Sequence, residues 1–256
     1  MKKLWFVILA ALTSAQGIIA QDGVEYGLAN HLGVGVSVGS DGIGVEVATP
    51  LTDYFALRAG VSFFPKISYE DNFKLNDRNP DIANNVDVKG NLNFFDVKLL
   101  ADIYPFKSSG FHLTAGILFG KENLVSAENT SMFITDPAKY GKLGLKLGDY
   151  RVTTDKNGYA HADVTVNSVK PYLGIGIGRA IPKKRISVSC DLGVQLWGTP
   201  RLGAMTKDEW DQETYHKFEY TELDEYDDED LRDGLEIASK FKVWPVINIR
   251  INGRIF

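Results

Sequence analysis

The chain has 256 residues and a formal net charge of −5, and 44% of its residues are hydrophobic. This composition allows a folded domain with a large apolar surface, and the lack of a basic excess argues against nucleic-acid binding. The single cysteine, Cys190, excludes an internal disulfide framework and is interpreted as a small apolar filler on a strand.

The beginning of the chain has the pattern of a secretory signal peptide. Lys2 and Lys3 precede an apolar run at 4–12, which small and polar residues follow up to Ala20. A membrane helix needs about 18 or more apolar residues, so this run is too short to be one. We expect a signal peptide at 1–20 and an outer-membrane β-barrel domain at 21–256. Cleavage after Ala15 and a buried N-terminal element are the alternatives.

Eight later stretches alternate between apolar and polar residues, which is typical of strands with two different faces. Every second connection is short and three of the others are long and polar, as in transmembrane barrels. The sequence therefore predicts an all-β fold: an eight-stranded antiparallel up-and-down transmembrane β-barrel with long extracellular loops and a short helix in the last loop. The stretches are 28–38, 43–48, 55–64, 92–104, 111–120, 169–177, 186–197 and 243–256.

Glycines indicate which face of these strands points inward. Gly60, Gly116 and Gly176 are among at least seven glycines on the polar face, whereas the other face carries branched and aromatic side chains. The interior of an eight-stranded barrel is only wide enough for side chains, so small residues belong there. We expect the polar face to line the lumen and the apolar face to contact lipid.

The polar face also carries four acids and four bases. Charges held away from bulk water are costly unless they are paired, so the equal tally predicts a cross-linked, structural lumen rather than an open pore. An active-site constellation is the alternative. The predicted lumen charge network is Glu46, Arg58, Asp96, Lys98, Asp102, Asp191, Arg250 and Arg254.

The connections predict an orientation. Three proline-led turns, at 50–53, 105–110 and 182–185, are expected on the periplasmic side. The hairpin at 40–42 and the segments 65–91, 121–168 and 198–242 are then extracellular loops. Within them we expect a hairpin of 150–154 with 159–166 and a helix near 231–241. Aromatic residues at the strand ends are expected to form two interfacial girdles.

No metal, cofactor or catalytic residue is predicted. The segment 207–236 holds 14 acidic residues, but the spacing of a calcium loop is absent, so we interpret it as solvated charge, with weak cation binding as the alternative. His31 and His112 are expected to face the lumen, and His161 and His216 to lie in loops. None has a serine partner on its strand face, and Thr114 beside His112 is the nearest approach to a nucleophile–base pair.

Several stretches resemble the small outer-membrane β-barrel proteins of the OmpA/OmpW type and an uncharacterised porin-like group. They are 51–60 (LTDYFALRAG), 97–118, 170–179 (KPYLGIGIGR), 191–200 (DLGVQLWGTP) and 231–256. The resemblance implies a multi-pass barrel in the outer membrane of a Gram-negative-type cell, with membrane lipids as partners. It also implies that the last strand, which ends at Phe256, is read by the barrel-assembly machinery. It transfers no catalytic residues.

Four functions remain open on the sequence. The leading hypothesis is a non-catalytic barrel with a structural or binding role through its extracellular loops, whose ligand is unknown. The alternatives are a narrow channel for small hydrophobic or cationic molecules, a lipid-modifying barrel enzyme, and a secreted lipocalin-like carrier.

Overall fold

The computed structural model describes residues 24–75, 79–147, 150–207, 213–218 and 240–256. In these ranges the regular structure is almost wholly antiparallel β-sheet, so the all-β prediction is confirmed. No helix in this part of the chain is long and apolar enough to cross a membrane. The predicted signal peptide at 1–20, and all but the last two residues of the helix predicted at 231–241, lie outside the described residues.

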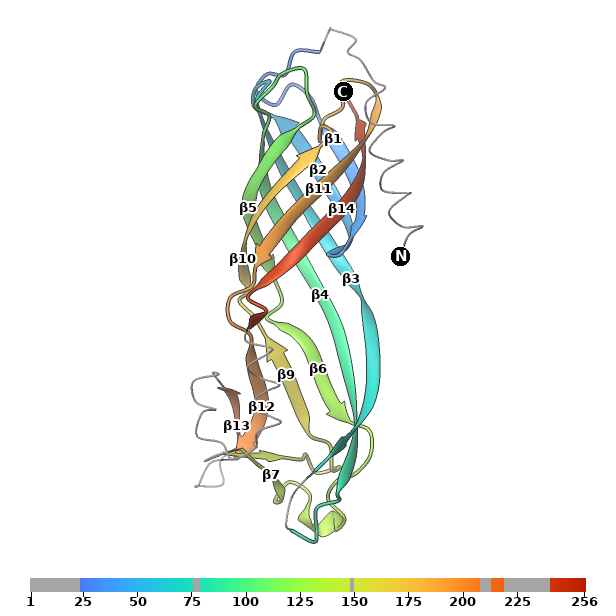
Figure 1. The fold of residues 1–256 in the computed structure, drawn as a ribbon, viewed down its shortest axis with the longest axis vertical. Coiled ribbons are helices and arrows are strands. Elements are labelled where there is room, and N and C mark those ends of the chain that lie inside the picture. The colour runs from blue at the N-terminus through green and yellow to red at the C-terminus, as the bar shows by residue number, and fades with distance from the viewer. Residues whose placement is uncertain (1–23, 76–78, 148–149, 208–212, 219–239) are drawn as a thin grey trace.

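Eight strands pair in a closed circuit, which forms the upper half of Figure 1. Each strand is antiparallel to both neighbours, β14 pairs with β1, and the β3–β4 pairing completes the ring. In circuit order the strands are β1 (Gly33–Gly39), β2 (Gly42–Pro50), β3 (Phe55–Lys74), β4 (Asn85–Ile103), β5 (His112–Gly120), β10 (Val169–Ile177), β11 (Ile186–Leu196) and β14 (Val243–Arg254). Each predicted stretch overlaps one of them, although β1, β2, β3 and β4 run beyond the predicted bounds.

The circuit has two different ends. Its turn end carries the three proline-led connections, the start of β1 and the end of β14, where Gly33 pairs with Arg254. Its loop end carries the hairpin between β1 and β2 and the long connections. Because β3 and β4 continue far past their neighbours at the loop end, the molecule is elongated along the strand direction (Figure 1).

The predicted loop at 65–91 is wrong for most of its length, because β3 runs to Lys74 and β4 starts at Asn85. A β-bulge between Phe64 and Ile67 separates the two parts of β3, and Pro65 lies inside it. A proline donates no ladder hydrogen bond and is tolerated at such a bulge. The extra residue shifts the alternation, so that Ile67 pairs with Leu92 on the side of the sheet that faces inward in the circuit.

Six further strands continue the sheet away from the circuit, in the lower half of Figure 1. Together with the parts of β3 and β4 beyond the bulge, they form a region that we call the extension. The sheet continues from β4 through β6 to β9 and β12. β12 pairs with β13 along one edge and with β8 along the other, and β8 in turn pairs with β7. Their bounds are β6 (Asn123–Asn129), β7 (Gly144–Leu147), β8 (Tyr150–Thr153), β9 (His161–Thr165), β12 (Arg201–Lys207) and β13 (Glu213–Phe218).

The hairpin expected from 150–154 and 159–166 does not form as predicted. The turn between them is present, since the N–H of Asp155 donates to the oxygen of Tyr159 at 2.7 Å. However, β8 and β9 both pair antiparallel with β12, at Thr206–Lys207 and at Arg201–Ala204 respectively. The two strands therefore follow one another along one edge of β12 instead of pairing with each other.

The orientation of the two faces is confirmed. Burial alternates along the circuit strands, and the apolar residues Val34, Leu99 and Ile175 are 37%, 48% and 49% exposed. Their polar neighbours, among them Glu46 and Asp96, are buried in the interior. The outer surface of the circuit is consequently a continuous apolar belt. The outer row of the extension is instead polar, and its residues Lys66, Ser68 and Glu70 are all exposed to solvent.

Candidate functional site

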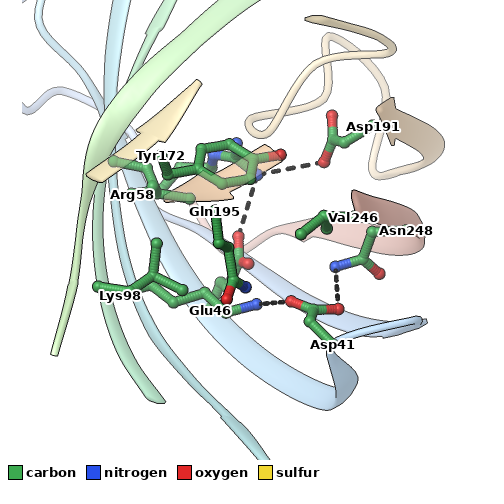
Figure 2. A pocket seen from close by; sticks show the side chains of 11 residues that line it. Asp41, Glu46, Arg58, Lys98, Tyr172, Asp191, Gln195, Val246 and Asn248 are labelled. Carbon is green, nitrogen blue, oxygen red and sulfur yellow. Dashed lines mark hydrogen bonds and ion pairs between the residues drawn. The ribbon is translucent and has the colours of Figure 1, made fainter. Parts of the chain in front are cut away.

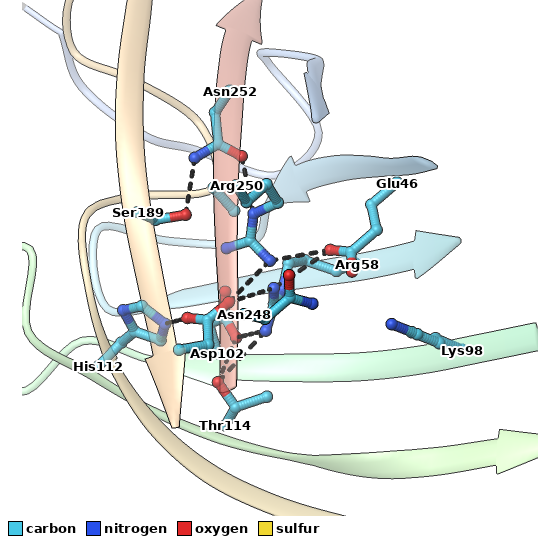
Figure 3. A network of polar contacts seen from close by, with 12 residues as sticks. Glu46, Arg58, Lys98, Asp102, His112, Thr114, Ser189, Asn248, Arg250 and Asn252 are labelled. Carbon is cyan, nitrogen blue, oxygen red and sulfur yellow. Dashed lines mark hydrogen bonds and ion pairs between the residues drawn. The ribbon is translucent and has the colours of Figure 1, made fainter. Parts of the chain in front are cut away.

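The centre of the circuit contains a network of buried ion pairs (Figure 3). The guanidinium of Arg58 lies 3.1 Å from Glu46 Oε2, 3.0 Å from Asp102 Oδ1 and 3.4 Å from Asp191 Oδ2. Arg250 Nη1 lies 2.9 Å from Glu46 Oε2 and 3.0 Å from Asp191 Oδ2. Two arginines from β3 and β14 thus bridge three carboxylates from β2, β4 and β11. This holds opposite walls of the circuit together.

Two further pairs lie closer to the loop end. Lys98 Nζ pairs with Asp41, which the hairpin between β1 and β2 folds inward. Lys170 Nζ lies 2.7 Å from Asp96 Oδ1, and both side chains are fully buried. A buried lysine and carboxylate are tolerated only as partners, because either charge alone carries a large desolvation penalty.

His112 faces two acceptors. Its Nδ1 lies 3.0 Å from the main-chain oxygen of Gly110, and its Nε2 lies 2.8 Å from Asp191 Oδ1. A carbonyl and a carboxylate both accept, so these partners assign a proton to each ring nitrogen. With His112 positively charged, the buried groups of the described chain comprise five carboxylates and five cations. The interior is then electrically balanced.

Seven of the eight residues predicted for the lumen network are buried in this interior, and each contacts an opposite charge. Arg254 is the exception. It is half-buried at the turn end, where β14 stops, and its Nη1 donates to the main-chain oxygen of Lys183 at 3.0 Å. Arg254 has the same parity as the inward-facing Arg250 on β14, but it lies at the end of the strand and therefore beyond the network.

The sequence analysis missed two members of the network. Lys170 has the parity of Gly174 and Gly176 on β10, so the alternation of that strand could have identified it. Asp41 is in a turn, where parity gives no signal, and the structure alone places it inside. His31, expected in the lumen, instead lies at the turn end with Nδ1 2.9 Å from the main-chain oxygen of Phe256.

Aromatic side chains close the loop end of the interior. Trp197 and Trp244 stack with centroids 4.7 Å apart, and Phe94 meets both edge-to-face at 6.1 and 6.0 Å. Phe64 stacks on the other side of Phe94 at 4.7 Å. These four rings and the buried Tyr172 are aromatic residues at strand ends that were expected in the interfacial girdle on this side, and for them the prediction is wrong. The aromatic residues that remain outside at this level are Phe63, Phe95 and Phe119.

The turn end is closed by the segment that precedes β1. Tyr26 is buried and its hydroxyl donates to the main-chain oxygen of Ile181 at 2.8 Å. It belongs to a cluster with Tyr104 and Ile181, and the guanidinium of Arg179 lies 4.4 Å from the centroid of Tyr104. Burial raises the pKa of Tyr26, so its hydroxyl stays protonated and remains a donor.

Between these two seals, a cavity of about 10 Å³ is lined by residues that include Glu46, Arg58, Lys98 and Tyr172 (Figure 2). A space of this size holds about one water molecule. The charged side chains of the network are buried, so side chains rather than bulk water fill the middle of the circuit.

One pair in the interior has the residue types of a catalytic base and acid. His112 and Asp191 form a base–acid pair, but both are buried, and Thr114 Oγ1 donates to Asp102 Oδ1 at 2.8 Å rather than to His112. A nucleophile must lie within reach of its base and be accessible to a substrate. Among the described residues no group of three or more histidine, cysteine or acidic side chains is arranged to hold a metal ion.

Comparison with solved structures finds distant likeness. CarO from Acinetobacter baumannii is 18% identical over 86% of this chain and 96% of that chain, with a TM-score of 0.47. CarO2 from the same organism is 18% identical over 91% and 100%, with a TM-score of 0.46. A major outer membrane protein from Thermus thermophilus is 13% identical over 88% and 98%, with a TM-score of 0.37. No protein-family model and no curated protein matches the sequence. The likeness assigns no family, and the OmpA/OmpW-type resemblance stays a prediction.

Replacement of Arg58 by alanine tests whether the ion-pair network holds the circuit together. The variant leaves Glu46, Asp102 and Asp191 with fewer partners, and breaking a buried pair costs about 3–5 kcal/mol. We expect the free energy of unfolding, measured by urea titration in lipid vesicles, to fall by about that amount. Lys66→Ala, on the exposed part of the same strand, should change it by less than about 0.5 kcal/mol. Equal stability of both variants would contradict the bridging role.

A glycine pair tests the tightness of the interior. A Cβ on Gly176 would lie 2.3 Å from Asp191 Oδ1 and 2.5 Å from His112 Nε2, whereas a Cβ on Gly90 would have no atom nearer than 3.9 Å. Overpacking typically costs about 1–3 kcal/mol. Gly176→Ala should therefore lower the free energy of unfolding by about that amount. Gly90→Ala should leave it nearly unchanged in the same titration.

Proposed function

We propose that this protein is a non-catalytic integral outer-membrane β-barrel with a sealed interior, and that its role is structural or binding. Its eight-strand circuit spans the membrane, and the extension stands above the membrane on the cell exterior. The observation that carries the proposal is the pairing of an apolar outer belt with an interior filled by ion pairs and closed at both ends.

The outer belt supports a membrane location. Branched and aromatic side chains such as Val36, Val188 and Ile251 are 58%, 61% and 59% exposed on the circuit. A water-soluble protein rarely exposes so large a continuous apolar surface. A closed circuit also leaves no backbone edge unpaired, which is the condition for a β-structure in lipid. A soluble lipocalin-like carrier has the opposite polarity, with its apolar face inside.

The sealed interior supports a role other than transport. The aromatic seal, the ion-pair network and the cluster at the turn end lie in series along one narrow interior. Each would have to open before a solute could pass. The burial of His112 and Asp191 likewise argues against a lipid-modifying enzyme, because no lipid at the outer surface reaches them.

The extension supports a role on the exterior. It places a sheet with a polar outer row well beyond the belt, and it ends in a small apolar core of Ile82, Val86, Phe133 and Ile134. A sheet with its own core is a stable platform for contacts with a ligand or another surface. Insertion through the barrel-assembly machinery, guided by the last strand and Phe256, belongs to the same proposal.

Electrical recording tests the sealed interior. The purified protein, inserted into planar bilayers, should give no single-channel conductance above the bare bilayer. The double variant Phe94→Ala/Trp197→Ala removes most of the aromatic seal but leaves the ion pairs, so it should also stay silent. Discrete channel openings in the wild-type protein would refute a sealed barrel and favour the narrow-channel alternative.

A charge placed on the belt tests the membrane location. Leu99 lies on the outer face midway along the circuit part of β4, so Leu99→Arg should lower the free energy of unfolding in vesicles by about 2–4 kcal/mol. Ser126→Arg, on the exposed outer row of the extension, should change it by about 0–1 kcal/mol. Equal effects at the two positions would show that Leu99 does not contact the acyl chains.

A further inference from the structure

A groove opens at the turn end, where the start of β1 meets the end of β14. Its volume is about 470 Å³. One part of its lining is apolar, with Val24, Ile255 and Phe256, and the last two of these are 60% and 63% exposed. The other part is polar and consists of Glu25, His31, Arg185 and Arg254. The groove thus joins a cationic surface to the edge of the apolar belt at the turn end.

The turn end as a whole is strongly basic. Among its described residues, only Glu25 and Asp53 are acidic. Asp53 is already paired, since Lys107 Nζ lies 2.8 Å from its Oδ2. The hydrogen bond from Lys107 lowers the pKa of Asp53 and raises that of Lys107. The basic residues at this end are Lys107, Arg179, Lys183, Lys184, Arg185 and Arg254.

The groove is held in shape by main-chain contacts. Arg254 donates from its backbone N–H to the oxygen of Arg185 at 2.9 Å, and from its guanidinium to the oxygen of Lys183 at 3.0 Å. This ties the turn between β10 and β11 to the end of β14. His31 Nδ1 faces the main-chain oxygen of Phe256 at 2.9 Å, which ties the other wall to the same strand. The basic side chains of the groove are therefore carried by short, hydrogen-bonded segments rather than by a long loop.

We propose that this groove binds the phosphate-bearing headgroup of an anionic phospholipid in the leaflet at the turn end. Arginine and lysine are suited to phosphate oxygens through charge-assisted hydrogen bonds. A phospholipid matches the groove in both its parts, because its headgroup meets Arg185 and Arg254 while its acyl chains continue along Ile186 and Ile255. A free phosphate would use the cations alone. The inference depends on the membrane location proposed above.

The test is retention of lipid by the purified, folded protein in detergent, measured by native mass spectrometry. Phosphatidylglycerol and phosphatidylethanolamine are supplied at equal mole fraction, and the wild-type protein should retain several times more of the former. The variant Lys183→Gln/Lys184→Gln/Arg185→Gln should lose this preference. The control Lys66→Gln/Lys74→Gln/Lys89→Gln makes the same change in charge on the exposed extension and should keep it.

Three results would overturn the inference. The first is equal retention of both lipids by the wild-type protein, and the second is an unchanged preference in the turn-end variant. The third is displacement of phosphatidylglycerol by glycerol phosphate at the same concentration, which would indicate a site for soluble phosphate. Each variant is first shown to be folded by its heat-dependent gel mobility, and Arg185→Gln alone replaces the triple variant if that variant does not fold.

The same preparation separates this inference from the proposed function. Flotation with vesicles reports membrane insertion, whatever lipid is bound. A protein that floats but shows no preference for phosphatidylglycerol contradicts the lipid site alone. A protein that stays in the aqueous fraction without detergent contradicts the membrane barrel and, with it, the lipid site.

Discussion

The narrowness of the space inside eight strands is the constraint on which the structure depends. That space admits side chains but no separate core, so every inward residue must be small or find a partner across the circuit. The chain meets this requirement with glycines beside large groups: a Cβ on Gly35 would lie 2.8 Å from Arg250 Cδ. The arginine side chain occupies the space that a glycine without a side chain leaves free. Carboxylates from other strands then neutralise its charge.

This constraint also explains why the ends differ from the middle. Charges in the centre are matched, whereas the loop end is closed by stacked rings and the turn end by Tyr26 and its neighbours. Apolar seals exclude water from the ion pairs and so strengthen them, because electrostatic interactions grow as the local dielectric constant falls. Seals and network therefore support one another.

The bulge at Pro65 divides the molecule into two regions with different surroundings. Before it, the odd-numbered residues of β3, such as Val61, point outward to the belt. After it, Ile67, Tyr69 and Phe73 lie on the inward side, and the outward row becomes polar. One extra residue therefore ends the apolar belt on this strand while the sheet itself continues. Apolar and polar residues alternate at 67–74 in the sequence. Because the bulge interrupts the alternation of 55–64, this part of β3 was not predicted as a strand.

The sequence by itself determined the strands of the circuit, the direction of their faces and most of the lumen charges, because a period of two and the position of glycine are local signals. It did not determine contacts that depend on distant segments. Trp197 and Trp244 could be placed at strand ends, but their stacking over Phe94 depends on how three strands converge. Asp41 lies in a turn and pairs with Lys98 of β4, and β12 pairs with both segments that local turn chemistry would have paired with each other. The tertiary structure decided these points, since long-range pairing and burial outweigh the preference of a short segment.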